Sequence, residues 1–140
     1  MRIPAFESHM ATSLMEETMY AHIGLEVTNL EASTRFYQAV LEPLGHKLCS
    51  RDELSASFGS PADPALYLYR SKRASGSGTH VALRAEQRSA VRNFHEQGLR
   101  AGGTDHGAPG VRADYSPNYY AAFLLDPDGN NVEAVCSTSE

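Results

Sequence analysis

The chain has 140 residues, of which 41% are apolar and 21% are charged, values that fit one globular domain and exclude a disordered or collagen-like chain. Its formal net charge is −5 and its basic residues are scattered, which argues against nucleic-acid and anionic-membrane partners. No apolar run approaches the roughly 18 residues of a membrane span, and the N-terminus lacks a secretion-signal pattern. We therefore expect a cytoplasmic protein with a small-molecule partner.

Residues 19–140 are interpreted as one domain made of a duplicated module. Sliding the sequence against itself places His22-Ile23-Gly24-Leu25 over His80-Val81-Ala82-Leu83, and the continuing alignment places Phe36 over Phe94 and Gly45 over Gly103. We assign 19–71 to the first module, 72–78 to a Gly/Ser-rich linker and 79–137 to the second module. Residues 1–18 fit neither module, so we treat them as an N-terminal extension or, since they contain Ser8-His9-Met10, as a cloning remnant.

The first module begins with a strand that alternates apolar and polar residues from His22 to Val27. Asn29 is a plausible N-cap for the helix that follows, and Pro43 and Gly45 end that helix. Turn residues then separate three further strands, predicted at 47–51, 55–58 and 65–70.

The second module repeats this order. A strand from His80 precedes a helix predicted over 86–97, and a short strand near Thr104 precedes a loop over 107–118. That loop is either a lid or an ordinary surface loop, and its candidate residues are Arg112, Asp114 and Tyr115. Strands at 119–125 and 131–136 complete the module. The predicted fold is therefore α+β, with two βαβββ modules.

Three side chains have the chemistry of metal ligands. His22 and His80 hold equivalent positions in the first strands of the two modules, on the face opposite the aliphatic residues. Glu133 lies on the corresponding face of the last strand, where a carboxylate among apolar neighbours is costly unless it is paired or binds a cation. Two imidazoles and one carboxylate form a facial ligand set that leaves positions open for water or substrate.

These motifs, with Asp126-Pro127-Asp128-Gly129-Asn130 before the last strand, resemble the vicinal oxygen chelate superfamily over roughly residues 20–136. This superfamily includes glyoxalase I, extradiol dioxygenases, fosfomycin-resistance enzymes and bleomycin-binding proteins. The resemblance implies a curved, mixed sheet of eight strands that cups a divalent metal held by His22, His80 and Glu133. It does not distinguish Fe, Zn, Mn, Ni and Mg. It also implies a homodimer, in which one site is built from one chain or from two.

The chain departs from each named branch of this superfamily. Glyoxalase I has a fourth ligand, a glutamate, on the strand that here reads Ala65-Leu66-Tyr67-Leu68-Tyr69. The dioxygenases and fosfomycin enzymes have a tyrosine where this chain has Phe123, and the fosfomycin enzymes have a threonine where it has Gly24. Bleomycin-binding proteins lack the metal ligands. A lyase, isomerase or dioxygenase reaction therefore stays open, with a small-molecule binding or sequestering protein as the alternative.

Tyr67 and Glu26 are the predicted acid-base residues, because both are placed on inward-facing strand positions. Tyr67 lies opposite Glu133 in the module alignment and is placed to donate a hydrogen bond to a metal-bound oxygen. Glu26 shares a face with His22 and is a candidate base. Tyr69 and Tyr119 are further candidates for the lining of the same site.

Overall fold

The computed structural model describes residues 19–73 and 79–140, and within them it contains two βαβββ modules. The first module consists of β1 (Ile23–Val27), α2 (Leu30–Leu41), the 3₁₀ turn η1 (Glu42–Leu44), β2 (Lys47–Arg51), β3 (Ser55–Ser60) and β4 (Asp63–Arg70). The second consists of β5 (His80–Arg84), α3 (Arg88–Arg100), β6 (Thr104–Val111), β7 (Tyr120–Leu125) and β8 (Asn131–Cys136). The predicted extension 1–18 and most of the predicted linker lie outside the described residues.

The helix ends follow from local capping. The side chain of Asn29 accepts a hydrogen bond from the backbone N–H of Ala32 at 3.0 Å and so caps α2, as predicted. Gly45, at φ 93°, ends the η1 turn in the left-handed conformation that glycine adopts without strain. No helix in the described ranges is both long enough and apolar enough to cross a membrane.

The predicted loop over 107–118 is partly wrong, because β6 continues to Val111. Two irregularities in the pairing of β6 with β7, around Gly107 and before Gly110, interrupt the strand without ending it. The glycines and the proline of this segment are residues typical of loops, so the sequence indicated a loop. In the structure, pairing with β7 holds the segment as an irregular strand. The helix predicted over 86–97 is also longer and runs over Arg88–Arg100.

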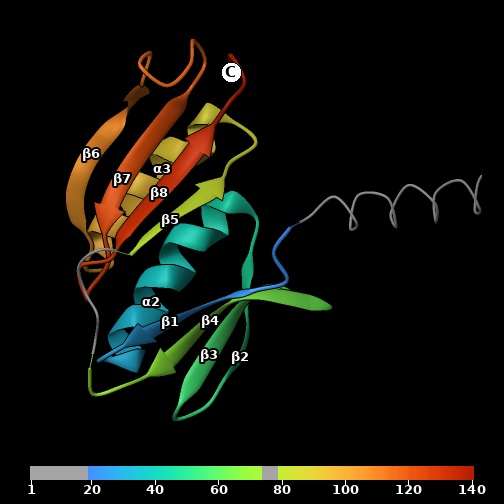
Figure 1. The fold of residues 1–140 in the computed structure, drawn as a ribbon, viewed down its shortest axis with the longest axis vertical. Helices are drawn as coiled ribbons and strands as arrows, with labels where there is room; N and C mark the ends of the chain where they lie inside the picture. The colour runs from blue at the N-terminus through green and yellow to red at the C-terminus, as the bar shows by residue number, and fades with distance from the viewer. Residues whose placement is uncertain (1–18, 74–78) are drawn as a thin grey trace, which may run out of the picture.

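The eight strands form two mixed sheets of four, in the orders β1-β4-β3-β2 and β5-β8-β7-β6 (Figure 1). In each sheet the first strand pairs in parallel with the last strand of its module, and the other pairs are antiparallel. These findings confirm the predicted α+β class and the paired modules.

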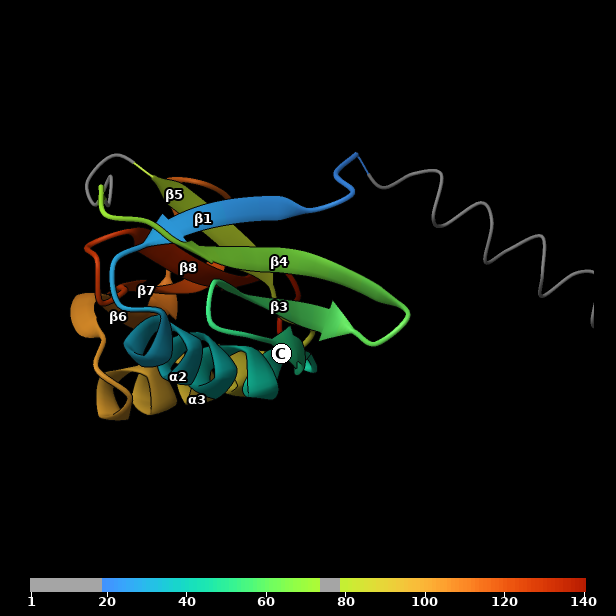
Figure 2. The ribbon, with the colours of Figure 1, turned by 90° about the horizontal axis from the view of Figure 1, so that it is seen from below.

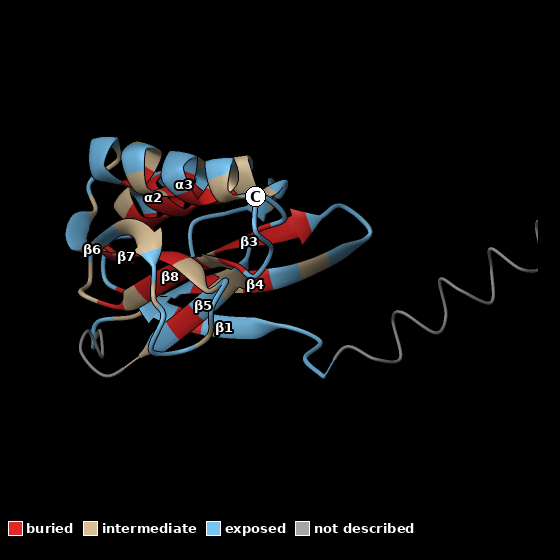
Figure 3. Ribbon diagram, turned by 90° about the horizontal axis from the view of Figure 1, so that it is seen from above, coloured by how far each residue is buried: buried red, intermediate tan, exposed pale blue. Residues whose placement is uncertain are grey.

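Both helices lie on one side of the two sheets (Figure 2). The helices pack against each other, and one buried cluster joins their apolar faces to both sheets (Figure 3). Phe36 and Phe94, the pair that the repeat alignment superimposes, are both fully buried in this cluster. Each sheet therefore has a helix-covered face and an opposite face, which we call its open face.

A buried polar contact joins the two modules. The Tyr37 hydroxyl of α2 donates a hydrogen bond of 2.5 Å to Asp126, in the turn between β7 and β8. Asp126 also accepts hydrogen bonds from the backbone N–H groups of Asp128 and Asn130 and from the Asn130 side chain. Asp126 is 3% exposed, and the desolvation cost of its carboxylate is offset by these four donors.

Candidate functional site

The open face of the second sheet carries a histidine–carboxylate pair. The register places Glu133 of β8 opposite Ala82 of β5 and opposite Phe123 of β7, so their side chains share one face. His80, two residues before Ala82, is on this same face, and its Nε2 lies 2.9 Å from Oε1 of Glu133. The ring of Phe123 lies beside the His80 ring, with centroids 6.3 Å apart. Two of the three predicted ligands are therefore in contact.

Glu133 is buried although it lies on the open face. Glu133 as a whole is 2% exposed. The Tyr119 hydroxyl donates a hydrogen bond of 2.5 Å to its second carboxylate oxygen, Oε2. Burial, followed by this hydrogen bond and the nearby carboxylate charge, raises the pKa of Tyr119 to about 12. Within the described residues no lysine or arginine pairs with Glu133. A buried carboxylate with one imidazole neighbour and no fixed cation suits a bound metal ion.

The open face of the first sheet carries the other half of the predicted site. Gly24 of β1 pairs with Tyr67 of β4 in the same way that Ala82 pairs with Glu133, so Tyr67 holds the position equivalent to Glu133. His22 lies against Tyr67 edge to face, with ring centroids 5.2 Å apart. In both modules, therefore, the histidine of the first strand contacts the equivalent residue of the last strand: His22 contacts Tyr67, and His80 contacts Glu133. The two modules thus share this arrangement as well as the sequence pattern.

Gly24, which stands where fosfomycin enzymes have a threonine, is covered by an aromatic ring. A Cβ at this position would come within 2.9 Å of the Tyr69 ring, which is stacked on Tyr67 at 6.1 Å. Glycine thus makes room for Tyr69 to lie across β1. The remaining predicted residue, Glu26, forms an exposed ion pair with Arg73 at 3.7 Å, further along the same face.

The structure does not bring all three predicted ligands together in one chain. Among the described residues, no group of three or more histidine, cysteine, aspartate or glutamate side chains is close enough to hold a metal ion. His80 and Glu133 form one half, on the second sheet, and His22 lies with Tyr67 on the first sheet.

Tyr119 contacts Glu133 directly, whereas the sequence predicted it only as a lining residue of the site. The alternation of side chains along a strand could have indicated this contact. Tyr119 and Phe123 are four residues apart, so a strand over 119–125 places both on the same face. Sequence spacing alone could not show that its side chain reaches the carboxylate, since that contact depends on how the ring leans along the sheet.

A model of the Glyoxalase/Bleomycin resistance protein/Dioxygenase superfamily matches residues 20–134. The chain belongs to this superfamily. A search of curated proteins found no match.

Solved members of the glyoxalase/bleomycin resistance/dioxygenase superfamily share the fold over most of this chain. A glyoxalase/bleomycin resistance protein from Albidiferax ferrireducens T118 is 30% identical, with a TM-score of 0.76 over 85% of this chain and 99% of its own. A family enzyme from Burkholderia phytofirmans PsJN is 18% identical, with a TM-score of 0.67 over 84% and 98%. A putative glyoxalase from Bacillus halodurans is 24% identical, with a TM-score of 0.64 over 88% and 98%. These likenesses establish the fold and leave the reaction open.

Proposed function

We propose that this protein is a metal-dependent enzyme that binds a small oxygen-bearing substrate at a site made of His22, His80 and Glu133. The observation that carries the proposal is the buried Glu133 carboxylate, which is held by His80 and Tyr119 and has no lysine or arginine partner among residues 19–73 and 79–140. The superfamily typically uses a divalent metal. When bound, that ion would supply a Lewis acid for a lyase, isomerase or dioxygenase reaction.

We further propose that a homodimer completes the site. In one chain the helices pack side by side, and both open faces are turned away from them (Figure 2). A second copy related by a two-fold axis can place its first sheet against the second sheet of this copy. His22 of one copy would then face His80 and Glu133 of the other, and the symmetry would form two such sites. This arrangement accounts for a histidine and a histidine–carboxylate pair held apart within one chain.

The neighbouring side chains have distinct roles in this proposal. Tyr119 holds one oxygen of Glu133 by a hydrogen bond and leaves the other turned toward His80, which fixes the carboxylate as outer-shell partners of metal ligands do. Tyr67 comes with His22 from the opposing sheet, and its hydroxyl is a candidate donor to a substrate oxygen. Glu26 is a candidate base once it leaves its exposed ion pair with Arg73.

Elemental analysis of protein purified without chelator tests the proposal. We expect about one divalent ion per chain in the wild type and at least a tenfold loss of metal affinity in His80→Ala, because one of the ligands is removed. His106→Ala is the matched control, since His106 is an exposed histidine of β6. A wild-type protein that neither contains nor takes up a divalent ion would contradict the enzyme proposal and favour small-molecule binding without a metal.

A further inference from the structure

Arg112 lies on the same open face as Glu133 and His80. The register pairs Gly107 of β6 with Phe123 of β7, which pairs in turn with Glu133 of β8. A Cβ on Gly107 would point at the Phe123 side chain and would lie 3.3 Å from the Nη2 atom of Arg112. The guanidinium is therefore on the face that carries the histidine–carboxylate pair.

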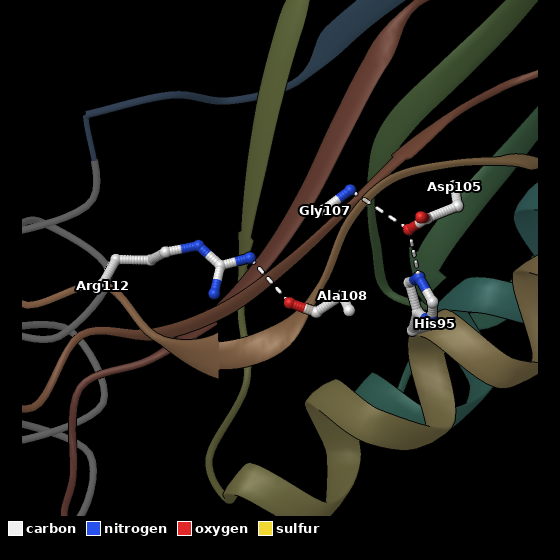
Figure 4. Close-up of polar contacts among 5 residues, drawn as sticks. All are labelled: His95, Asp105, Gly107, Ala108 and Arg112. Carbon is white, nitrogen blue, oxygen red and sulfur yellow. Dashed lines mark hydrogen bonds and ion pairs between the residues drawn. The ribbon is translucent and has the colours of Figure 1, made fainter.

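Contacts with β6 and with Phe123 of β7 hold the guanidinium of Arg112 in place. Its Nη2 donates a hydrogen bond of 2.6 Å to the carbonyl oxygen of Ala108 (Figure 4). Its central carbon lies 5.5 Å from the centroid of the Phe123 ring, within cation–π range. A Cβ at Gly107 or Gly110 would come within 3.3 or 3.0 Å of its terminal nitrogens, so both glycines make room for it. The side chain of Arg112, the residue that follows β6, folds back over that strand.

Most of the N–H donors of Arg112 have no acceptor among the described residues. A guanidinium has five N–H donors, and one of them is used by Ala108. Arg112 forms no ion pair with any carboxylate in the part of the chain that the structure describes. The result is a preorganised cation, half-buried beside Phe123, whose planar fork suits an oxyanion.

We propose that Arg112 binds an anionic group of the substrate, a carboxylate or a phosphate, at the end remote from His80 and Glu133. This inference rests on the proposed function, because it assigns a substrate class to the same site. Strands β8 and β6 are separated by β7, so the backbones of Glu133 and Gly107 are roughly 10 Å apart. A substrate that reaches both ends must therefore extend across Phe123 and carry its chelating oxygens and its anionic group at opposite ends.

The first test needs no metal. The Nε–H resonance of Arg112 and the backbone amide resonances of Gly107 and Gly110, which lie against its guanidinium, are followed by NMR in metal-free, full-length protein during separate titrations with glutarate and inorganic phosphate. The two amide resonances report binding in variants that lack the arginine. We expect a saturable shift, and the anion that binds more tightly identifies the group as carboxylate or phosphate. Arg112→Gln should weaken binding roughly 10- to 100-fold, the effect of losing a charge-assisted hydrogen bond, and Arg112→Lys should weaken it less. Arg100→Gln, which changes an exposed arginine paired with Glu96 on α3, should leave binding unchanged.

The second test uses the metal-loaded protein and two probes with the same 2-oxo acid group, 2-oxoglutarate and 2-oxopentanoate. Calorimetry should show tighter binding of 2-oxoglutarate, roughly 10-fold or more, if the remote group is a carboxylate, and this preference should disappear in Arg112→Gln. If neither glutarate nor phosphate shifts Arg112 saturably, the inference is overturned, whatever the metal content. If an anion binds at Arg112 but the protein takes up no metal, the inference stands and the enzyme proposal fails.

Discussion

Replacing Tyr37 with phenylalanine tests whether the hydrogen bond between the modules stabilises the fold. The substitution keeps the buried ring and removes the hydroxyl that donates to Asp126 at 2.5 Å. A hydrogen bond to a charged group contributes about 1.5–3 kcal/mol. Asp126 keeps its three other donors, from Asp128 and Asn130, so no charge is left unpaired. We therefore expect Tyr37→Phe to lower the free energy of unfolding by about 1.5–2 kcal/mol.

Urea unfolding measures this change, provided that the slope of stability against urea concentration stays constant. Tyr120→Phe is the matched control, because the Tyr120 hydroxyl accepts one exposed hydrogen bond, of 3.3 Å from Arg92, in the part of the chain that the structure describes. The control should change stability by less than about 0.5 kcal/mol. If Tyr37→Phe costs no more than Tyr120→Phe, the contact with Asp126 does not stabilise the junction of the modules and the reasoning fails.

Three further outcomes follow from the described contacts. Burial raises the pKa of Tyr37 well above its usual 10, so at high pH the folded state keeps a proton that the unfolded state loses. The free energy of unfolding should therefore be independent of this group below pH 10 and should fall as the pH rises above 10. In Tyr37→Phe this fall should be less steep. The hydrogen bond from His95 lowers the pKa of Asp105 (Figure 4), so His95→Ala should raise that pKa toward 3.8 in an NMR titration. His80→Ala should change metal-free stability by less than about 1 kcal/mol, because the His80 side chain is 46% exposed, so that water can replace it at Glu133, which keeps its hydrogen bond from Tyr119; a larger loss would assign it a structural role.

The elements were predictable where the pattern of the sequence is local. Asn29 as a cap and the alternation in β1 identify the first strand and helix, and the match of His22 with His80 identifies the duplication. The end of β6 was missed because Gly107 and Gly110 favour turns by themselves, and only pairing with β7 keeps them in a strand.

The arrangement of the candidate site was predictable in part for the same reason. Period-two alternation placed His80 and Glu133 on one face of neighbouring strands, where they are in contact. The contact between Tyr119 and Glu133 depends on how a long side chain leans across the sheet, and the separation of His22 depends on how the two modules pack. The spacing of residues within one module predicts neither this contact nor this separation.

The central claim is that His22 of one copy and His80 with Glu133 of another form one metal site. It is tested most directly by metal analysis of a mixed dimer, made by co-expressing His22→Ala and His80→Ala chains with different tags and purifying the heterodimer. If sites form between copies, one site of this heterodimer lacks both histidines and the other is intact. We predict that it binds one divalent ion tightly, whereas neither parent variant does. A heterodimer that binds metal no better than its parents would contradict the claim.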